Sequence, residues 1–118
     1  MIKIEFFKSG KTYFGFRETG HANFDDAGKD VVCAAVSAMT MLIINTVEVS
    51  CGSDIKYDID EKTTDITVIA KDALPKYCKD EKKQYAISKL FEGYYIQLND
   101  MLEDYYDYID VTETQKSI

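Results

Sequence analysis

One histidine and one cysteine in the first third of the chain have the residue types and the spacing for nucleophilic catalysis. His21 is the only histidine in the sequence, and Cys33 follows it after a short loop, at the expected start of a long apolar helix. A thiol attacks as the thiolate, which the positive end of a helix and a neighbouring imidazolium both favour. His21 could then serve as base and acid through an acyl-transfer cycle. The pair predicts a Cys–His hydrolase.

A structural role is the alternative for each residue. Cysteine outside disulfides is among the most buried residue types, so Cys33 taken alone would more often be a core residue. Its place in the first turn of the expected helix, after Asp30 and downstream of His21, favours a reactive thiol. His21 could instead be a hydrogen-bonded structural histidine. Zinc takes three or four protein ligands, and Cys51 and Cys78 lack ligand spacing, so the sequence predicts no metal site and no cofactor.

Two polar residues flank the thiol on the expected helix. Asp30 is placed to cap the helix N-terminus, a role that contributes about 1 kcal/mol, and it could instead orient His21 as the third member of a triad. We favour the cap. Ser37 lies one turn beyond Cys33 on the same face and could line the site or hydrogen-bond the helix backbone, and both roles stay open. Unpaired N–H groups at the helix start, including that of Cys33, are the expected oxyanion donors.

Residues 20–22 (Gly-His-Ala) and 28–37 (Gly-Lys-Asp-Val-Val-Cys-Ala-Ala-Val-Ser) together resemble the motif of the bacterial ribosomal-processing cysteine protease family, Prp. Chain length and element order match as well, so the resemblance covers most of the sequence. It implies that His21 and Cys33 are the catalytic pair, and that Gly20, Asp30 and Ser37 belong to the surrounding motif.

The resemblance also implies a substrate and an assembly. Enzymes of this kind remove a short N-terminal extension from a large-subunit ribosomal protein precursor, cut after an aromatic residue and form homodimers. The loop at 23–29 and the tyrosine-rich second helix carry little of the motif, so a related but different substrate stays open. The loop could be a lid over bound peptide or a passive connector.

Composition limits the classes of partner and compartment. At 118 residues and 13.5 kDa, the chain has the size of one domain, residues 1–118. A net charge of −7 argues against nucleic-acid binding as the main activity, and it would attract a basic partner such as a ribosomal protein segment or simply aid solubility. Three cysteines without paired spacing, and a start that alternates like a strand, predict a cytoplasmic protein with reduced thiols.

Hydrophobic periodicity predicts the elements that hold the pair. Strands are expected over 2–6 and 12–19, and a helix from Asp30 to about Val49. The uncharged run of this helix, from 31 to 47, has 17 residues, fewer than the roughly 20 apolar residues of a membrane span, and it contains polar residues. We therefore expect no membrane insertion but a helix buried nearly all round, covered by the sheet and by the second helix or a partner subunit.

The second half predicts a hairpin, a helix and a last strand. The hairpin strands are expected over 55–59 and 64–70, the helix over 84–106 and the strand over 109–113. An apolar seam steps along this helix by fours and threes through Ile87, Phe91, Tyr94, Leu98, Met101 and Tyr105. Gly93 is expected at a close approach. The order β-β-α-β-β-α-β predicts an α+β, two-layer fold with a mixed sheet and two long helices on one face.

Two rival functions remain at this point. One is a non-catalytic acidic interaction module or assembly factor for a basic, ribosomal partner. The other is a different Cys–His acyl-transfer enzyme, such as an amidase. Rapid labelling of Cys33 below pH 7 would favour an enzyme. Cleavage of a peptide that spans an extension junction would favour the protease.

Overall fold

The computed structural model of the chain describes residues 1–20 and 27–118. Their strands form one five-stranded sheet in the order β3-β4-β2-β1-β5. Neighbouring strands are antiparallel except β1 and β5, which are parallel, so the sheet is mixed, as predicted. The strands are β1 (Ile2–Ser9), β2 (Thr12–Thr19), β3 (Lys56–Ile59), β4 (Ile66–Ile69) and β5 (Ile109–Gln115).

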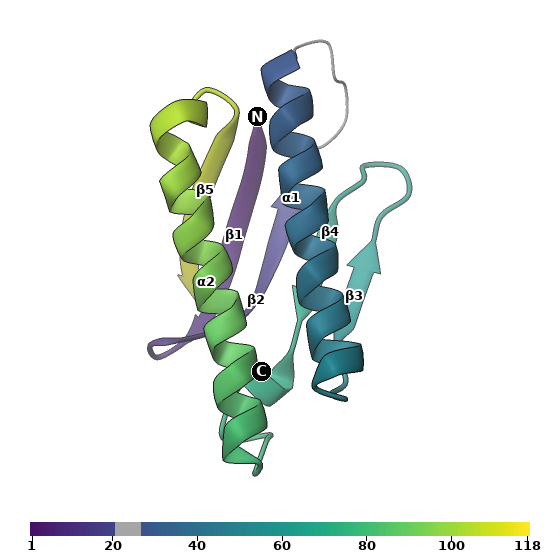
Figure 1. Ribbon diagram of the computed structural model, residues 1–118, viewed down its shortest axis with the longest axis vertical. Coiled ribbons are helices and arrows are strands. Elements are labelled where there is room, and N and C mark those ends of the chain that lie inside the picture. The colour runs from purple at the N-terminus through teal and green to yellow at the C-terminus, as the bar shows by residue number, and fades with distance from the viewer. Residues whose placement is uncertain (21–26) are drawn as a thin grey trace.

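Two long helices lie side by side on one face of this sheet (Figure 1). They are α1 (Ala27–Asn45), which continues as a π-helical turn over Thr46–Ser50, and α2 (Glu81–Tyr105). A short 3-10 helix, Lys71–Ala73, precedes α2. The predicted two-layer α+β architecture and its element order are confirmed.

The first hairpin follows from alternation and a glycine turn. Ile2, Ile4 and Phe6 of β1 are fully buried beneath the helices, while Lys3 between them is exposed. Gly10 turns the chain with a φ of +62°, a conformation that residues with a Cβ rarely adopt. β1 runs to Ser9, beyond its predicted end, because both of its edges are hydrogen-bonded, to β2 and to β5.

α2 begins earlier than its apolar pattern predicts because Asp80 caps it. The Asp80 carboxylate accepts hydrogen bonds from the backbone N–H groups of Lys82 and Lys83, each at 3.1 Å. The predicted seam is confirmed in its first four members, Ile87, Phe91, Tyr94 and Leu98, which are buried. The expected close approach at Gly93 is wrong: a Cβ there would meet no atom within 4 Å.

α1 departs from prediction at its start and on its outer side. It begins at Ala27, so it includes 27–29 of the predicted loop. Its inner residues, such as Val36, are buried in the core, but Val31, Met41 and Leu42 are each more than half exposed. The expectation of a helix buried nearly all round is therefore wrong for a single chain, because the sheet covers only one of its sides and α2 lies beside it.

Residues Asp30–Ser50 form a helix that is long and apolar enough to cross a membrane by length and composition alone. The core helix of a soluble protein passes the same test. The inner side of this helix packs in the same core as the sheet, through residues such as Val32, Val36 and Ile43.

Candidate active site

The end of β2 is fixed by a glycine that has no room for a side chain. Gly20 has a φ of +87°, and a Cβ at this position would lie 2.2 Å from the backbone oxygen of Met1. No side chain fits there without moving the backbone, so the end of β2 requires a glycine at this position. His21 comes next, but His21 and the rest of 21–26 lie outside the described residues. The approach of His21 to Cys33 therefore stays a prediction. Whether the loop acts as a lid or as a connector stays open.

Cys33 lies on the inner side of α1, in the second helical turn. Its side chain is 8% exposed and belongs to the core cluster that includes Val32 and Val36. Because α1 begins at Ala27, the unpaired N–H groups belong to 27–30, and the N–H of Cys33 lies within the helical hydrogen-bond ladder. The expectation that this N–H is an unpaired oxyanion donor is wrong. The helix dipole acts mainly within the first turn, which leaves the imidazole as the principal predicted source of thiolate stabilisation.

Asp30 and Ser37 occupy different surroundings from Cys33. Asp30 is exposed within the first turn of α1, so its prediction as N-cap is wrong. Its negative charge still complements the positive end of the helix. Ser37 is exposed although it stands one turn beyond the buried Cys33. Figure 1 shows the start of α1 and the N-terminus at the same end of the molecule, which is also the end where Gly20 contacts Met1.

A buried polar cluster joins β2 to both helices, and the sequence analysis missed it. Glu18 of β2 is completely buried, and Thr40 of α1 and Tyr94 of α2 are 2% and 4% exposed. The Thr40 hydroxyl donates to Glu18 Oε1 at 2.6 Å, and the Tyr94 hydroxyl donates to the same oxygen at 2.7 Å. The signal was present in β2, where Glu18 continues the inward-facing positions of Phe14 and Phe16.

Electrostatics keep Tyr94 a hydrogen-bond donor in this cluster. Burial raises the pKa of Tyr94 well above its usual value, and the nearby Glu18 raises it further. The neutral phenol is therefore retained throughout the physiological range. The cluster holds the strand end and the two helices through one shared carboxyl oxygen.

A second polar cluster spans β2, β1 and β5, with β1 in the middle. Glu113 accepts a hydrogen bond from the Tyr13 hydroxyl at 2.7 Å and pairs with Lys8 at 3.2 Å. Hydrogen bonds from Tyr95 and Tyr13 hold the pKa of Glu113 below its usual value. Lys8 is near the hairpin end of β1, far along the strand from Ile2, so this cluster stabilises the sheet edge and lies apart from Cys33.

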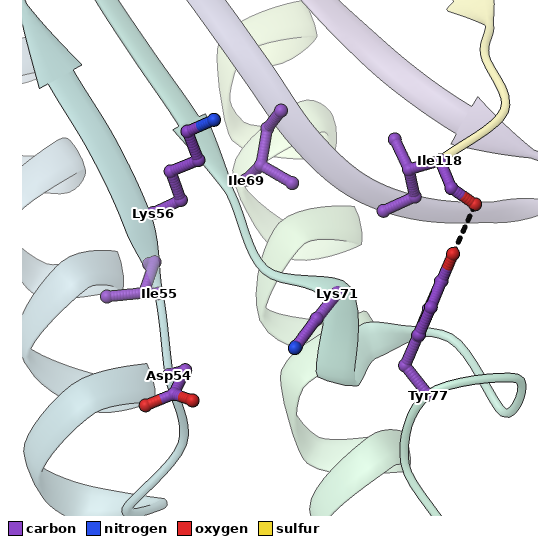
Figure 2. Close-up of a pocket in the computed structure, with 7 residues that line it drawn as sticks. All are labelled: Asp54, Ile55, Lys56, Ile69, Lys71, Tyr77 and Ile118. Atoms are coloured by element: carbon purple, nitrogen blue, oxygen red, sulfur yellow. Dashed lines mark hydrogen bonds between the residues drawn. The ribbon is translucent and has the colours of Figure 1, made fainter.

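A pocket of about 410 Å³ opens between the β3–β4 hairpin and the C-terminal residues (Figure 2). The Tyr77 hydroxyl donates a hydrogen bond to the backbone oxygen of Ile118, which is drawn as the dashed line. The C-terminus lies away from the start of α1 in Figure 1. The residues that line the pocket are Asp54, Ile55, Lys56, Ile69, Lys71, Tyr77 and Ile118. They include no thiol, so this pocket is separate from Cys33.

Metal-ligating side chains do not converge in the part of the chain that the structure describes. Within residues 1–20 and 27–118, no group of three or more His, Cys, Asp or Glu side chains is arranged to hold a metal ion. The absence of a metal at the full site, which would include His21, stays a prediction.

Comparison with known proteins gives the family. The sequence model of the family "Cysteine protease Prp" matches residues 1–110. The ribosomal processing cysteine protease Prp of Bacillus subtilis is 34% identical over 102 residues, which cover 86% of this chain and 87% of that protein.

Solved structures share the fold. A Streptococcus mutans protein matches with a TM-score of 0.79 at 25% identity, covering 98% of this chain and 99% of its own. The ribosomal processing protease Prp of S. aureus, crystallised with a substrate peptide, matches with a TM-score of 0.77 at 16% identity, covering 97% of this chain and 100% of its own. The chain therefore belongs to the Prp family of cysteine proteases and is a cysteine-type peptidase.

Proposed function

We propose that the chain is an endopeptidase in which Cys33 is the nucleophile and His21 the general base and acid. Its substrate is the precursor of a large-subunit ribosomal protein, from which it removes a short N-terminal extension by cutting after an aromatic residue. The observation that carries the proposal is the family match over residues 1–110, which contains both residues in their motif. Membership of a protease family also disfavours the non-catalytic interaction module.

The proposed chemistry proceeds through a thioester. His21 takes the proton from the Cys33 thiol, and the thiolate attacks the scissile carbonyl carbon to form a tetrahedral oxyanion. This intermediate collapses as the C–N bond breaks, and the imidazolium of His21 protonates the leaving amine. His21 then deprotonates a water molecule that attacks the thioester. The C–S bond breaks, the imidazolium of His21 returns its proton to the departing sulfur, and the acid product leaves as a carboxylate after losing its proton to water.

Charge and relatives support the choice of substrate. The curated B. subtilis relative is named for ribosomal processing, and the S. aureus structure holds a substrate peptide. A net charge of −7 attracts the basic segments that ribosomal proteins carry. The proposal places the enzyme in the reducing cytoplasm, where its three cysteines stay thiols, with no direct binding to nucleic acid or membrane.

The exposed side of α1 supports a homodimer. Val31, Ala34, Ala38, Met41 and Leu42 lie on that side, and the helix from 31 to 47 carries no charge. A second copy of the chain offers the same uncharged surface, so the two can cover each other about a two-fold axis.

Peptide cleavage tests the proposed function. A peptide that spans an extension junction, with an aromatic residue before the scissile bond, is incubated with wild type, Cys33→Ala, His21→Ala and Cys78→Ala. Cys78→Ala is the matched control, because Cys78 is another buried thiol, but it lies just before α2, outside the motif. Mass spectrometry should find one cut, after the aromatic residue, in wild type and the control, and none with Cys33→Ala.

Thiol labelling tests the proposed Cys33–His21 dyad independently of the proposed substrate. In a Cys51→Ser, Cys78→Ser background, iodoacetamide should label Cys33 readily below pH 7, and His21→Ala should move the midpoint towards the ordinary value of about 8.5. Readily labelled Cys33 without peptide cleavage would leave the Cys–His enzyme standing and exclude this substrate. A midpoint unchanged by His21→Ala would contradict the dyad.

A further inference from the structure

Glu18 is a charged residue type at a completely buried position in β2, close in sequence to the proposed base, His21. It stands two residues before Gly20, whose backbone is fixed against Met1, and three residues before His21. Its Oε1 atom accepts hydrogen bonds from Thr40 and Tyr94 at 2.6 and 2.7 Å. No step of the proposed chemistry uses this carboxyl group.

Fold stability alone gives little reason for a glutamate at this position. Moving a carboxyl group out of water is costly, and a well-packed apolar side chain in its place often leaves stability equal or higher. Phe14 and Phe16 show what the other inward positions of β2 hold. Hydrogen bonds, unlike apolar contacts, require a defined geometry. Those of Glu18 are satisfied in one arrangement of β2, α1 and α2 and are lost when one of these elements slides along another.

Thr40 and Cys33 belong to the same helix, α1, so a hydrogen bond that fixes Thr40 also fixes the position of Cys33. Seven residues separate the two, which is close to two full turns, so both lie on the same side of α1 at about 10 Å along its axis. Both are buried against the sheet. The position of Thr40 relative to Glu18 therefore sets how far Cys33 lies along β2, and hence its distance from the strand end that leads to His21.

We propose that Glu18 is a positioning residue for peptide cleavage, acting through Thr40 and Tyr94 to hold α1 and α2 in one register on β2. The proposal rests on the proposed function, because the register of the helices on β2 matters for catalysis only if His21 and Cys33 are the catalytic pair. Thr40 fixes the helix that carries the nucleophile, and Tyr94 fixes the same carboxyl oxygen from the opposite helix. In this role Glu18 acts through the two helices that it joins to β2.

Hydroxyl deletion on α1 is the first test. Thr40→Val keeps the shape of the side chain and removes its donor to Glu18. Thr46→Val is the matched control, because the Thr46 hydroxyl donates to the Leu42 carbonyl within its own helix at 2.7 Å. A displacement of about 1 Å can cost 100-fold in rate, so Thr40→Val should lower kcat roughly 10-fold or more with KM nearly unchanged. Thr46→Val should retain both values.

Adjacent tyrosines provide a second matched pair on α2. Tyr94→Phe removes the other donor to Glu18, whereas Tyr95→Phe removes a hydroxyl that interacts with Glu113 at the sheet edge. Tyr94→Phe should lower kcat in the same sense as Thr40→Val, and Tyr95→Phe should not. Melting temperatures of all four variants show whether kcat follows the loss of stability or the loss of contact with Glu18.

Iodoacetamide labelling of Cys33 gives a readout that needs no substrate. If wild type cleaves no junction peptide, the proposed function fails, and the pH midpoint of labelling decides the positioning role. A midpoint raised in Thr40→Val and Tyr94→Phe but unchanged in the two controls would support it. Wild-type kcat and labelling in Thr40→Val and Tyr94→Phe, with only the melting temperature lowered, would overturn it and leave Glu18 a structural residue.

Discussion

The surroundings of Cys33 and the backbone of Gly20 set conditions for the proposed chemistry at the scale of single residues. Cys33 is 8% exposed in the second turn of α1, where the helix end offers its sulfur little electrostatic help. The proposed thiolate therefore depends on His21, and the approach of that imidazole depends on how the chain leaves β2. Gly20, the last described residue before His21, has a left-handed backbone conformation and lies so close to Met1 that a Cβ would not fit.

Gly20→Ala should destabilise the protein more than Gly52→Ala. Both glycines have positive φ, which costs an L residue roughly 1–2 kcal/mol, but a Cβ at Gly52 meets nothing within 4 Å, whereas at Gly20 it would overlap the Met1 oxygen. Urea unfolding of the two variants isolates the overlap. Equal free energies of unfolding would show that Met1 simply moves aside.

Elements that show a regular hydrophobic pattern over a short stretch of sequence could be predicted from that pattern alone. Alternation gave β2 with its observed ends, and the stepped apolar positions gave the buried side of α2. The start of α1 was missed because Asp30 resembles a cap and residues 23–29 show no hydrophobic periodicity. Glu18 was missed because its partners, Thr40 and Tyr94, are 22 and 76 residues away and only the tertiary fold brings them to it.

The site could be predicted only as a set of residue types. Motif and spacing named His21 and Cys33, but the burial of Cys33 and the exposure of Ser37 depend on how α1 is rotated on the sheet. That rotation follows from packing by Val32, Val36 and other inner residues, which no motif encodes.

Glu113→Gln should change how the stability of the protein depends on pH in the acid range. Hydrogen bonds from Tyr95 and Tyr13 lower the pKa of Glu113, so its stabilising contribution is complete above the usual glutamate pKa and is lost as pH falls through the lowered one. Wild type should therefore exceed Glu113→Gln in stability at pH 7, and the difference should shrink as pH drops below about 4. Thermal unfolding across this range measures it. A difference independent of pH would show that the charge of Glu113 is immaterial.

At the scale of the whole molecule, the outer side of α1 is a surface that a single chain leaves apolar and exposed over several turns. Val31, Met41 and Leu42 are each more than half exposed on it. Because α1 also carries Cys33, a partner on this side would cover the helix that holds the proposed nucleophile.

Leu42→Glu should convert the proposed dimer to monomers. A carboxylate in the centre of an apolar interface loses its hydration without gaining a partner, and the two-fold axis doubles the cost. Ile96→Glu is the control, because Ile96 is equally exposed, at 57% against 58% for Leu42, but lies on α2. Light scattering after gel filtration should give twice the chain mass for wild type and the control. A monomeric wild type would refute the dimer.

The parallel pairing of β1 with β5 joins the two ends of the chain. Ile2 lies opposite Ile109 and Lys8 opposite Gln115, so the first strand to be synthesised obtains its second neighbour from the last. Loop closure over such a separation slows folding, and translation adds a further delay because β5 leaves the ribosome after every other element. The edge of β1 therefore stays open on the nascent chain until β5 has been made, and a protease proposed to process a ribosomal protein completes its own sheet only after its other strands and both helices have been synthesised.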